Sequence, residues 1–137
     1  MNKARALIAG HGDFAEGLRS AVVQISGRDD VFVTLSNRGL SAADVERVMR
    51  EQVEAAGLDV IFTDLPAGSC TMAARRVQRA RPDVVVVMGA NLAALLDFVF
   101  ASDEASPAEA ARHAVEKGRG SIVVTEGPAA GGGARGA

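Results

Sequence analysis

The sequence predicts an α/β domain in which a central parallel sheet is covered by helices on both faces. Short apolar segments alternate with amphipathic segments through the first four strands, which is the pattern of repeated strand and helix units. The run from Val84 to Met88 is apolar throughout, as is typical of a parallel strand buried on both sides. With 137 residues, the chain is long enough to bury one core. We expect one domain over residues 1–125 and a flexible tail, rich in Gly and Ala, over residues 126–137.

Five strands and five helices are predicted. The strands are expected at residues 4–9, 31–35, 58–63, 84–88 and 122–124, and the helices at residues 14–26, 42–56, 70–81, 92–100 and 107–117. Gly27 and Gly57 are placed to end the first two helices, and Pro82 helps to end the third. The last strand follows two consecutive helices, so its direction is open, and it can join its own sheet or be exchanged with a partner subunit.

Capping residues indicate where the helices begin. Asp13 with Glu16 and Ser41 with Asp44 have the spacing of a capping box. Ser106-Pro107-Ala108-Glu109 adds a proline at the first helical position to the same signature. Ser69 is placed to cap the third helix.

Composition excludes several classes of function. The net charge of −2 favours neither nucleic acid nor an anionic membrane, and the absence of Trp and Tyr leaves no stacking platform for single-stranded nucleic acid. The N-terminus is unlike a signal peptide, and no apolar run approaches the roughly 18 residues of a membrane span. The chain has one cysteine. We expect a cytoplasmic protein.

Two side chains that can do chemistry follow predicted strands. His11, between Gly10 and Gly12, follows the first strand, and Asp64 follows the third. If the strand order is 2-1-3-4, as in a flavodoxin-like open sheet, these strands are neighbours about 4.8 Å apart and the two side chains can share a hydrogen bond. A carboxylate on one ring nitrogen fixes the tautomer and leaves the other nitrogen free to attack. His11 and Asp64 are therefore the candidate catalytic residues.

A candidate anion site lies beside them. Gly68, Ser69, Cys70 and Thr71 would present backbone N–H groups at a helix N-terminus, where anions bind. We expect Gly12, Gly68, Ser69 and Cys70 to form the phosphate-binding site. No metal or organic cofactor is implied.

Three segments resemble the mannose-type (mannose, fructose and sorbose) enzyme IIA component of the bacterial sugar phosphotransferase system. They are ALIAGHGDFAEGL at residues 6–18, FTDLPAGSCTMAA at residues 62–74 and MGANLAALL at residues 88–96, and the likeness extends over about residues 4–124. The sequence departs from the family pattern at Pro66 and at Ala67-Gly68-Ser69-Cys70, which has one glycine fewer.

The resemblance implies a function. Such proteins accept a phosphoryl group on the histidine from the phosphocarrier protein HPr and pass it to a IIB component, so they meet the membrane only through the IIC and IID permease. They are homodimers that exchange the C-terminal strand. By this likeness His11 is phosphorylated through its Nε2, Asp64 orients the ring and Ser69 helps to hold the phosphoryl group. The IIB domain fused to some relatives is absent from this sequence, which implies a separate IIB acceptor.

Other functions remain open at this stage. The same resemblance fits a phosphotransfer subunit of dihydroxyacetone kinase. It also fits a regulatory module whose partner binding depends on phosphorylation of His11. A receiver domain phosphorylated on aspartate is disfavoured, because Gly10-His11-Gly12 stands where its acidic residues would be.

Overall fold

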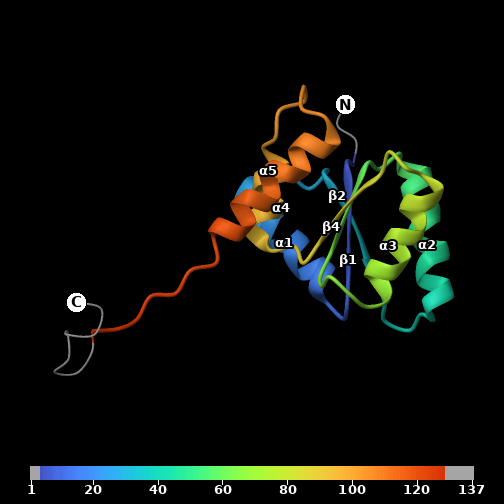
Figure 1. Cartoon of the computed structure of the whole chain (residues 1–137), viewed down its shortest axis with the longest axis horizontal. Helices are drawn as coiled ribbons and strands as arrows, with labels where there is room; N and C mark the ends of the chain where they lie inside the picture. Colours follow the sequence, from blue (N-terminus) through green and yellow to red (C-terminus); the bar gives the residue numbers. More distant parts are fainter. Residues whose placement is uncertain (1–3, 129–137) are drawn as a thin grey trace.

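The computed structural model describes residues 4–128 and contains a four-stranded parallel sheet (Figure 1). The strands are β1 (Ala6–Gly10), β2 (Phe32–Ser36), β3 (Val60–Thr63) and β4 (Val85–Met88), in the order β2-β1-β3-β4. Ala6 lies opposite Phe32 on one side and Val60 on the other, and Val60 lies opposite Val85. The predicted order 2-1-3-4 is confirmed, so the carboxyl ends of β1 and β3 are neighbours.

Helices cover both faces of this sheet. They are α1 (Phe14–Ser26), α2 (Ala42–Ala56), α3 (Ser69–Ala80), α4 (Leu92–Val99) and α5 (Pro107–Gly120). One core cluster joins the sheet to α1, α4 and α5, and a second joins it to α2 and α3. Along β1, Ala6 and Ile8 belong to the first cluster, and Leu7 and Ala9 to the second, which explains why the strand is apolar at successive positions.

Aromatic side chains fill the core between the sheet and α4. The ring centroids of Phe62 and Phe98 are 5.1 Å apart in an edge-to-face arrangement, and the Phe32 centroid lies 6.0 Å from that of Phe62 and 5.9 Å from that of Phe98. The guanidinium of Arg5 lies 4.7 Å from the centroid of the Phe98 ring. These contacts tie the start of the sheet to the helical layer.

The first helix begins at Phe14 as predicted, but of the four predicted side-chain caps two form and two do not. Ser41 and Ser106 cap α2 and α5 as expected, and the capping box of α5 is complete. Asp13 makes no capping hydrogen bond, because its ψ of 13° is not the extended value of a capping residue. Ser69 does not cap α3 either: the helix begins at Ser69 itself, after Gly68.

The C-terminal segment differs from the prediction. The helix α5 continues past Lys117 to Gly120, and residues 122–128 form no regular structure and extend away from the body of the molecule (Figure 1). Ile122, Val123 and Val124 are therefore exposed instead of forming a strand. Of the predicted tail, residues 126–128 are exposed, and residues 129–137 lie outside the described residues.

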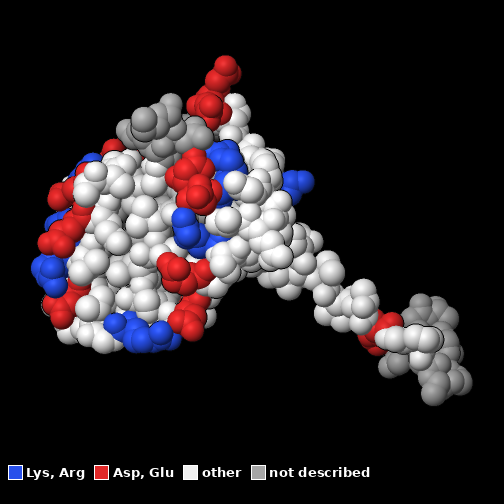
Figure 2. Space-filling view, turned by 180° about the vertical axis from the view of Figure 1, so that it is seen from behind, with Lys and Arg blue, Asp and Glu red and all other residues white. Residues whose placement is uncertain are grey.

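The charged surface is mixed. On the face shown in Figure 2, Lys and Arg side chains are interspersed with Asp and Glu and form no broad basic patch. None of the helices within residues 4–128 is long and apolar enough to cross a membrane.

Gly118 does not break α5 as the sequence suggested, and its packing against α4 generates a stability prediction. A Cβ at this buried position would lie 2.8 Å from Asn91 Oδ1 and 2.9 Å from Ala94 Cβ, so only glycine lets α5 pack this closely on α4. We expect Gly118→Ala to lower the free energy of unfolding by about 1–3 kcal/mol, measured by urea denaturation. The control is Gly120→Ala, where a Cβ meets nothing within 4 Å. Equal stability of the two variants would contradict this reading.

Candidate functional site

His11 and Asp64 meet at the carboxyl edge of the sheet. His11 follows β1 and Asp64 follows β3, and because these strands are adjacent the two side chains come together. The ring Nδ1 of His11 lies 2.7 Å from Asp64 Oδ2, and the backbone N–H of His11 donates to the same oxygen at 2.8 Å. The carboxylate therefore holds both the backbone and the ring of the histidine.

The charge on Asp64 fixes the tautomer of His11. Burial acts to raise the pKa of the Asp64 carboxyl group, but hydrogen bonds from the ring and the amide of His11 outweigh it and hold this pKa below its usual value of 3.8. An ionised carboxylate only accepts hydrogen bonds, so Nδ1 of His11 carries the proton. The Nε2 nitrogen then has a free lone pair, on a side chain that is 50% exposed.

Gly10 makes room for this pair. A Cβ at Gly10 would lie 3.0 Å from Asp64 Oδ2 and 2.6 Å from a ring carbon of Phe14. A side chain here would push the carboxylate away from His11 or displace the start of α1.

The exposed edge of the His11 ring faces the N-terminus of α3. Gly68 has a φ of 106°, and a Cβ there would lie 3.4 Å from His11 Cε1 and 3.9 Å from Nε2. The backbone that starts α3 therefore passes directly beside the free nitrogen. The first N–H groups of a helix have no acceptor within it, and the helix dipole favours negative charge at this end.

The four residues predicted to bind phosphate do not all present their side chains to the site. Gly68 lies beside the His11 ring, and the partly buried Ser69 follows it as the first residue of α3. Gly12 follows His11 directly, with a φ of 54°. The Cys70 side chain is fully buried against the core, where burial raises the pKa of its thiol, so only its backbone N–H can meet an anion.

Sequence reasoning missed two hydroxyl groups that hold the loop between β3 and α3. The hydroxyls of Thr63 and Thr71 are buried and lie 2.6 Å apart, and Thr71 donates to the carbonyl of Leu65. This network fixes the loop that carries Asp64 against the helix that carries Ser69. The eight-residue spacing of the two threonines gives no signal until the loop is folded.

The loop after β2 was also missed as part of the site. The backbone N–H of Asn37 donates to the carbonyl of Gly10, and the hydroxyl of Ser36 donates to the carbonyl of Gly12. The end of β2 and the loop after it therefore bind the backbone carbonyls of the residues before and after His11. Arg38 of this loop forms an ion pair of 3.0 Å with Asp13.

A second histidine and aspartate pair provides a comparison. Nδ1 of His113 lies 2.7 Å from Asp97 Oδ2, and the His113 side chain is exposed, as the sequence suggested. The hollow beside this pair is lined by acidic residues, Glu104 and Glu109. This surrounding disfavours an anion, so the helix N-terminus, and not the pair alone, distinguishes His11. Within residues 4–128, no cluster of three or more His, Cys, Asp or Glu is placed to hold a metal ion.

Comparisons with known proteins agree with the resemblance seen in the sequence and with the fold. The family model described as the PTS system fructose IIA component matches residues 5–115. A mannose/sorbose-specific IIA subunit of the phosphotransferase system from Enterococcus faecalis superposes with a TM-score of 0.78 at 20% identity, covering 93% of this chain and 98% of that chain. Component EIIA from Streptococcus agalactiae gives a TM-score of 0.80 at 21% identity, covering 88% and 96%.

A third solved structure, the PTS IIA protein associated with the fucose utilization operon from Streptococcus pneumoniae, gives a TM-score of 0.76 at 23% identity, covering 90% of this chain and 96% of that chain. No curated protein sequence matches the chain significantly.

The lowered pKa of Asp64 generates a prediction for stability. Because the pKa is lower in the folded than in the unfolded state, its contribution is complete above about pH 4 and is lost as the pH falls through the folded value. We expect Asp64→Asn to be less stable than the wild type at pH 7, with a difference that shrinks below about pH 4. Urea denaturation at stepwise pH measures this. A difference that is the same at pH 3 and pH 7 would rule out the ionised carboxylate as its source.

Proposed function

Because this chain belongs to the mannose-type IIA family of the sugar phosphotransferase system, we propose that it carries a phosphoryl group on Nε2 of His11. It accepts the group from phospho-HPr in the cytoplasm and passes it to a IIB component for carbohydrate uptake. The observation that carries the proposal is the 2.7 Å contact between Nδ1 and Asp64, with the Nε2 edge of the ring at the start of α3.

The transfer is an exchange of one nitrogen–phosphorus bond for another. The lone pair of Nε2 attacks the phosphorus in line, the bond to the donor's histidine breaks, and the donor ring keeps that electron pair. Positive charge develops on the His11 ring during the attack, and Asp64 stabilises it through the proton on Nδ1. The enzyme contributes positioning and charge, as in other phosphoryl transfers.

The phosphoryl oxygens are held by the start of α3. Backbone N–H groups of the first turn and the hydroxyl of Ser69 are the donors that this edge provides. The N–H groups of Gly12 and Cys70 complete the predicted set, and the Cys70 thiol takes no part.

The partner proteins dock on the same edge. Three large apolar side chains, from the loop after β3, from α3 and from β4, are about half exposed: Leu65, Met72 and Met88. Methionine adapts its shape to different surfaces, which suits a carrier that meets a donor and an acceptor in turn.

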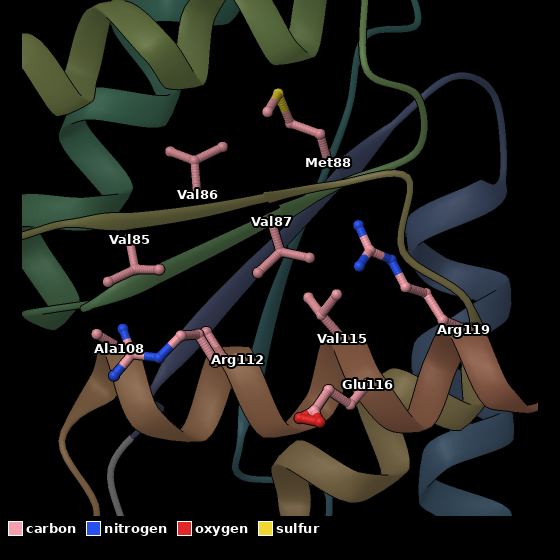
Figure 3. A pocket seen from close by; sticks show the side chains of 10 residues that line it. Val85, Val86, Val87, Met88, Ala108, Arg112, Val115, Glu116 and Arg119 are labelled. Carbon is pink, nitrogen blue, oxygen red and sulfur yellow. The ribbon is translucent and has the colours of Figure 1, made fainter.

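We further propose a homodimer that exchanges the C-terminal segment. On the side of β4 away from β3, a groove of about 480 Å³ lies between this strand and α5. Val85 and Val87 point from β4 toward α5, Val115 points back toward the strand, and Arg112 and Glu116 of α5 also line the groove (Figure 3). The exposed run Ile122-Val123-Val124 has the composition of a strand that could occupy this edge in a second copy.

Phosphorylation tests the main proposal. We expect the wild type, incubated with phosphoenolpyruvate, enzyme I and HPr, to gain one acid-labile phosphoryl group, measured by intact mass. His11→Ala should gain none. Asp64→Asn should gain it about 10- to 100-fold more slowly, because it loses a charged hydrogen bond to the reacting ring.

His113→Ala is the matched control, because it removes the other histidine and aspartate pair. It should be phosphorylated like the wild type. A wild type that gains no phosphoryl group from active phospho-HPr would refute the carrier function, and a phosphorylated His11→Ala would refute the site.

The dimer proposal makes a separate prediction. We expect the wild type to sediment as a dimer and Val123→Pro to sediment as a monomer, because proline cannot donate a backbone hydrogen bond to a neighbouring strand. Gly127→Ala is the control, since a Cβ there meets nothing within 4 Å. A monomeric wild type at tens of micromolar would contradict the exchange.

A further inference from the structure

We propose that Arg38 is the cation that binds the phosphoryl group on His11, and that Arg38 pairs with Asp13 while His11 is unphosphorylated. This inference rests on the proposed function of His11. It adds a basic residue to a site that the backbone and hydroxyl donors of α3 leave without a full positive charge.

Charge balance requires such a residue. A phosphoryl group on a histidine brings close to two negative charges at neutral pH, and it would stand near the ionised carboxylate of Asp64. The start of α3 offers only about half a positive charge. A guanidinium on the open side of the site would offset the repulsion between the two anions.

Arg38 lies in the loop after β2, which is hydrogen-bonded to the loop that carries His11. Its backbone N–H donates to the Ser36 hydroxyl, which itself donates to the carbonyl of Gly12. Because Gly12 is the next residue after His11, this chain of hydrogen bonds fixes the base of Arg38 against the histidine loop.

Gly12 lets the guanidinium approach. A Cβ at Gly12 would lie 3.4 Å from Nη2 of Arg38, so the guanidinium lies close over the backbone beside His11. Its Nη1 lies 3.0 Å from Asp13 Oδ1. The Arg38 and Asp13 side chains are 66% and 83% exposed, and an ion pair so open to water is weak. A doubly charged phosphoryl group can therefore compete with Asp13 for Arg38.

The test uses the full chain and loads His11 chemically, so that it depends on no partner. Potassium phosphoramidate phosphorylates histidine directly, and phosphorus NMR follows the titration of the attached group, with His11→Ala identifying its signal. A nearby cation lowers the pKa of the phosphoryl group. We expect that pKa to be about 0.5 to 1 unit higher in Arg38→Gln than in the wild type at low salt, with a smaller difference at high salt.

Three further variants separate this role from a structural one. Arg38→Lys should restore most of the shift, and Asp13→Asn should move the pKa of the phosphoryl group the other way by freeing Arg38. Arg47→Gln is the matched control, because Arg47 pairs with Asp44 and Glu51 on α2. A phosphoryl pKa in Arg38→Gln equal to that of the wild type overturns the inference, as does an equal shift in Arg47→Gln.

The same variants distinguish this inference from the proposed function. If chemically loaded His11 shows the shift and phospho-HPr does not phosphorylate the wild type, the Arg38 inference holds and the carrier function fails. If HPr phosphorylates the protein and the loaded variants show no shift, the carrier function holds and Arg38 is not the cation.

Discussion

One carboxylate oxygen organises the site. Oδ2 of Asp64 accepts both the backbone N–H and the ring Nδ1–H of His11, so a single atom fixes the turn after β1, the orientation of the imidazole and its tautomer. A bond to the ring alone would leave the loop free to move the histidine, and a bond to the amide alone would leave the ring free to rotate. Because Asp64 directly follows β3, the two contacts together fix the direction of Nε2 relative to the sheet.

The loops on either side extend this constraint. Ser36 and Asn37 bind the carbonyls that flank His11 from the β2 side, while Thr63 and Thr71 fix the β3 side against α3. His11 therefore lies beside two ordered loops: the one after β2 is hydrogen-bonded to the backbone around His11, and the one after β3 is held by the hydroxyls of Thr63 and Thr71. Because these loops are already ordered, they lose little conformational entropy when a partner docks.

The sequence predicted the first four strands and the five helices, because these follow from apolar periodicity, but the strand expected at residues 122–124 is absent. The meeting of His11 with Asp64 followed from the flavodoxin-like strand order assumed for the sheet, which the structure confirms. Sequence reasoning failed where side chains had alternative partners. Asp13 has the spacing of a cap but pairs with Arg38, and Glu16 accepts a hydrogen bond from Thr34. Gly118 looked like a helix breaker and is instead a packing contact with Ala94. Neither outcome can be read from spacing, since each depends on a residue brought near by the fold.

The exposed C-terminal run has a consequence for solubility. In the exchange proposed above, the exposed residues Ile122, Val123 and Val124 of one molecule would bind the outer edge of β4 of another. A reciprocal exchange between two copies would use each surface once and close on itself. A one-way exchange would leave one surface open at each end, and such a contact grows into filaments. The short linker after Gly120 would then decide between a finite assembly and an aggregate, by setting the angle at which the segment leaves α5.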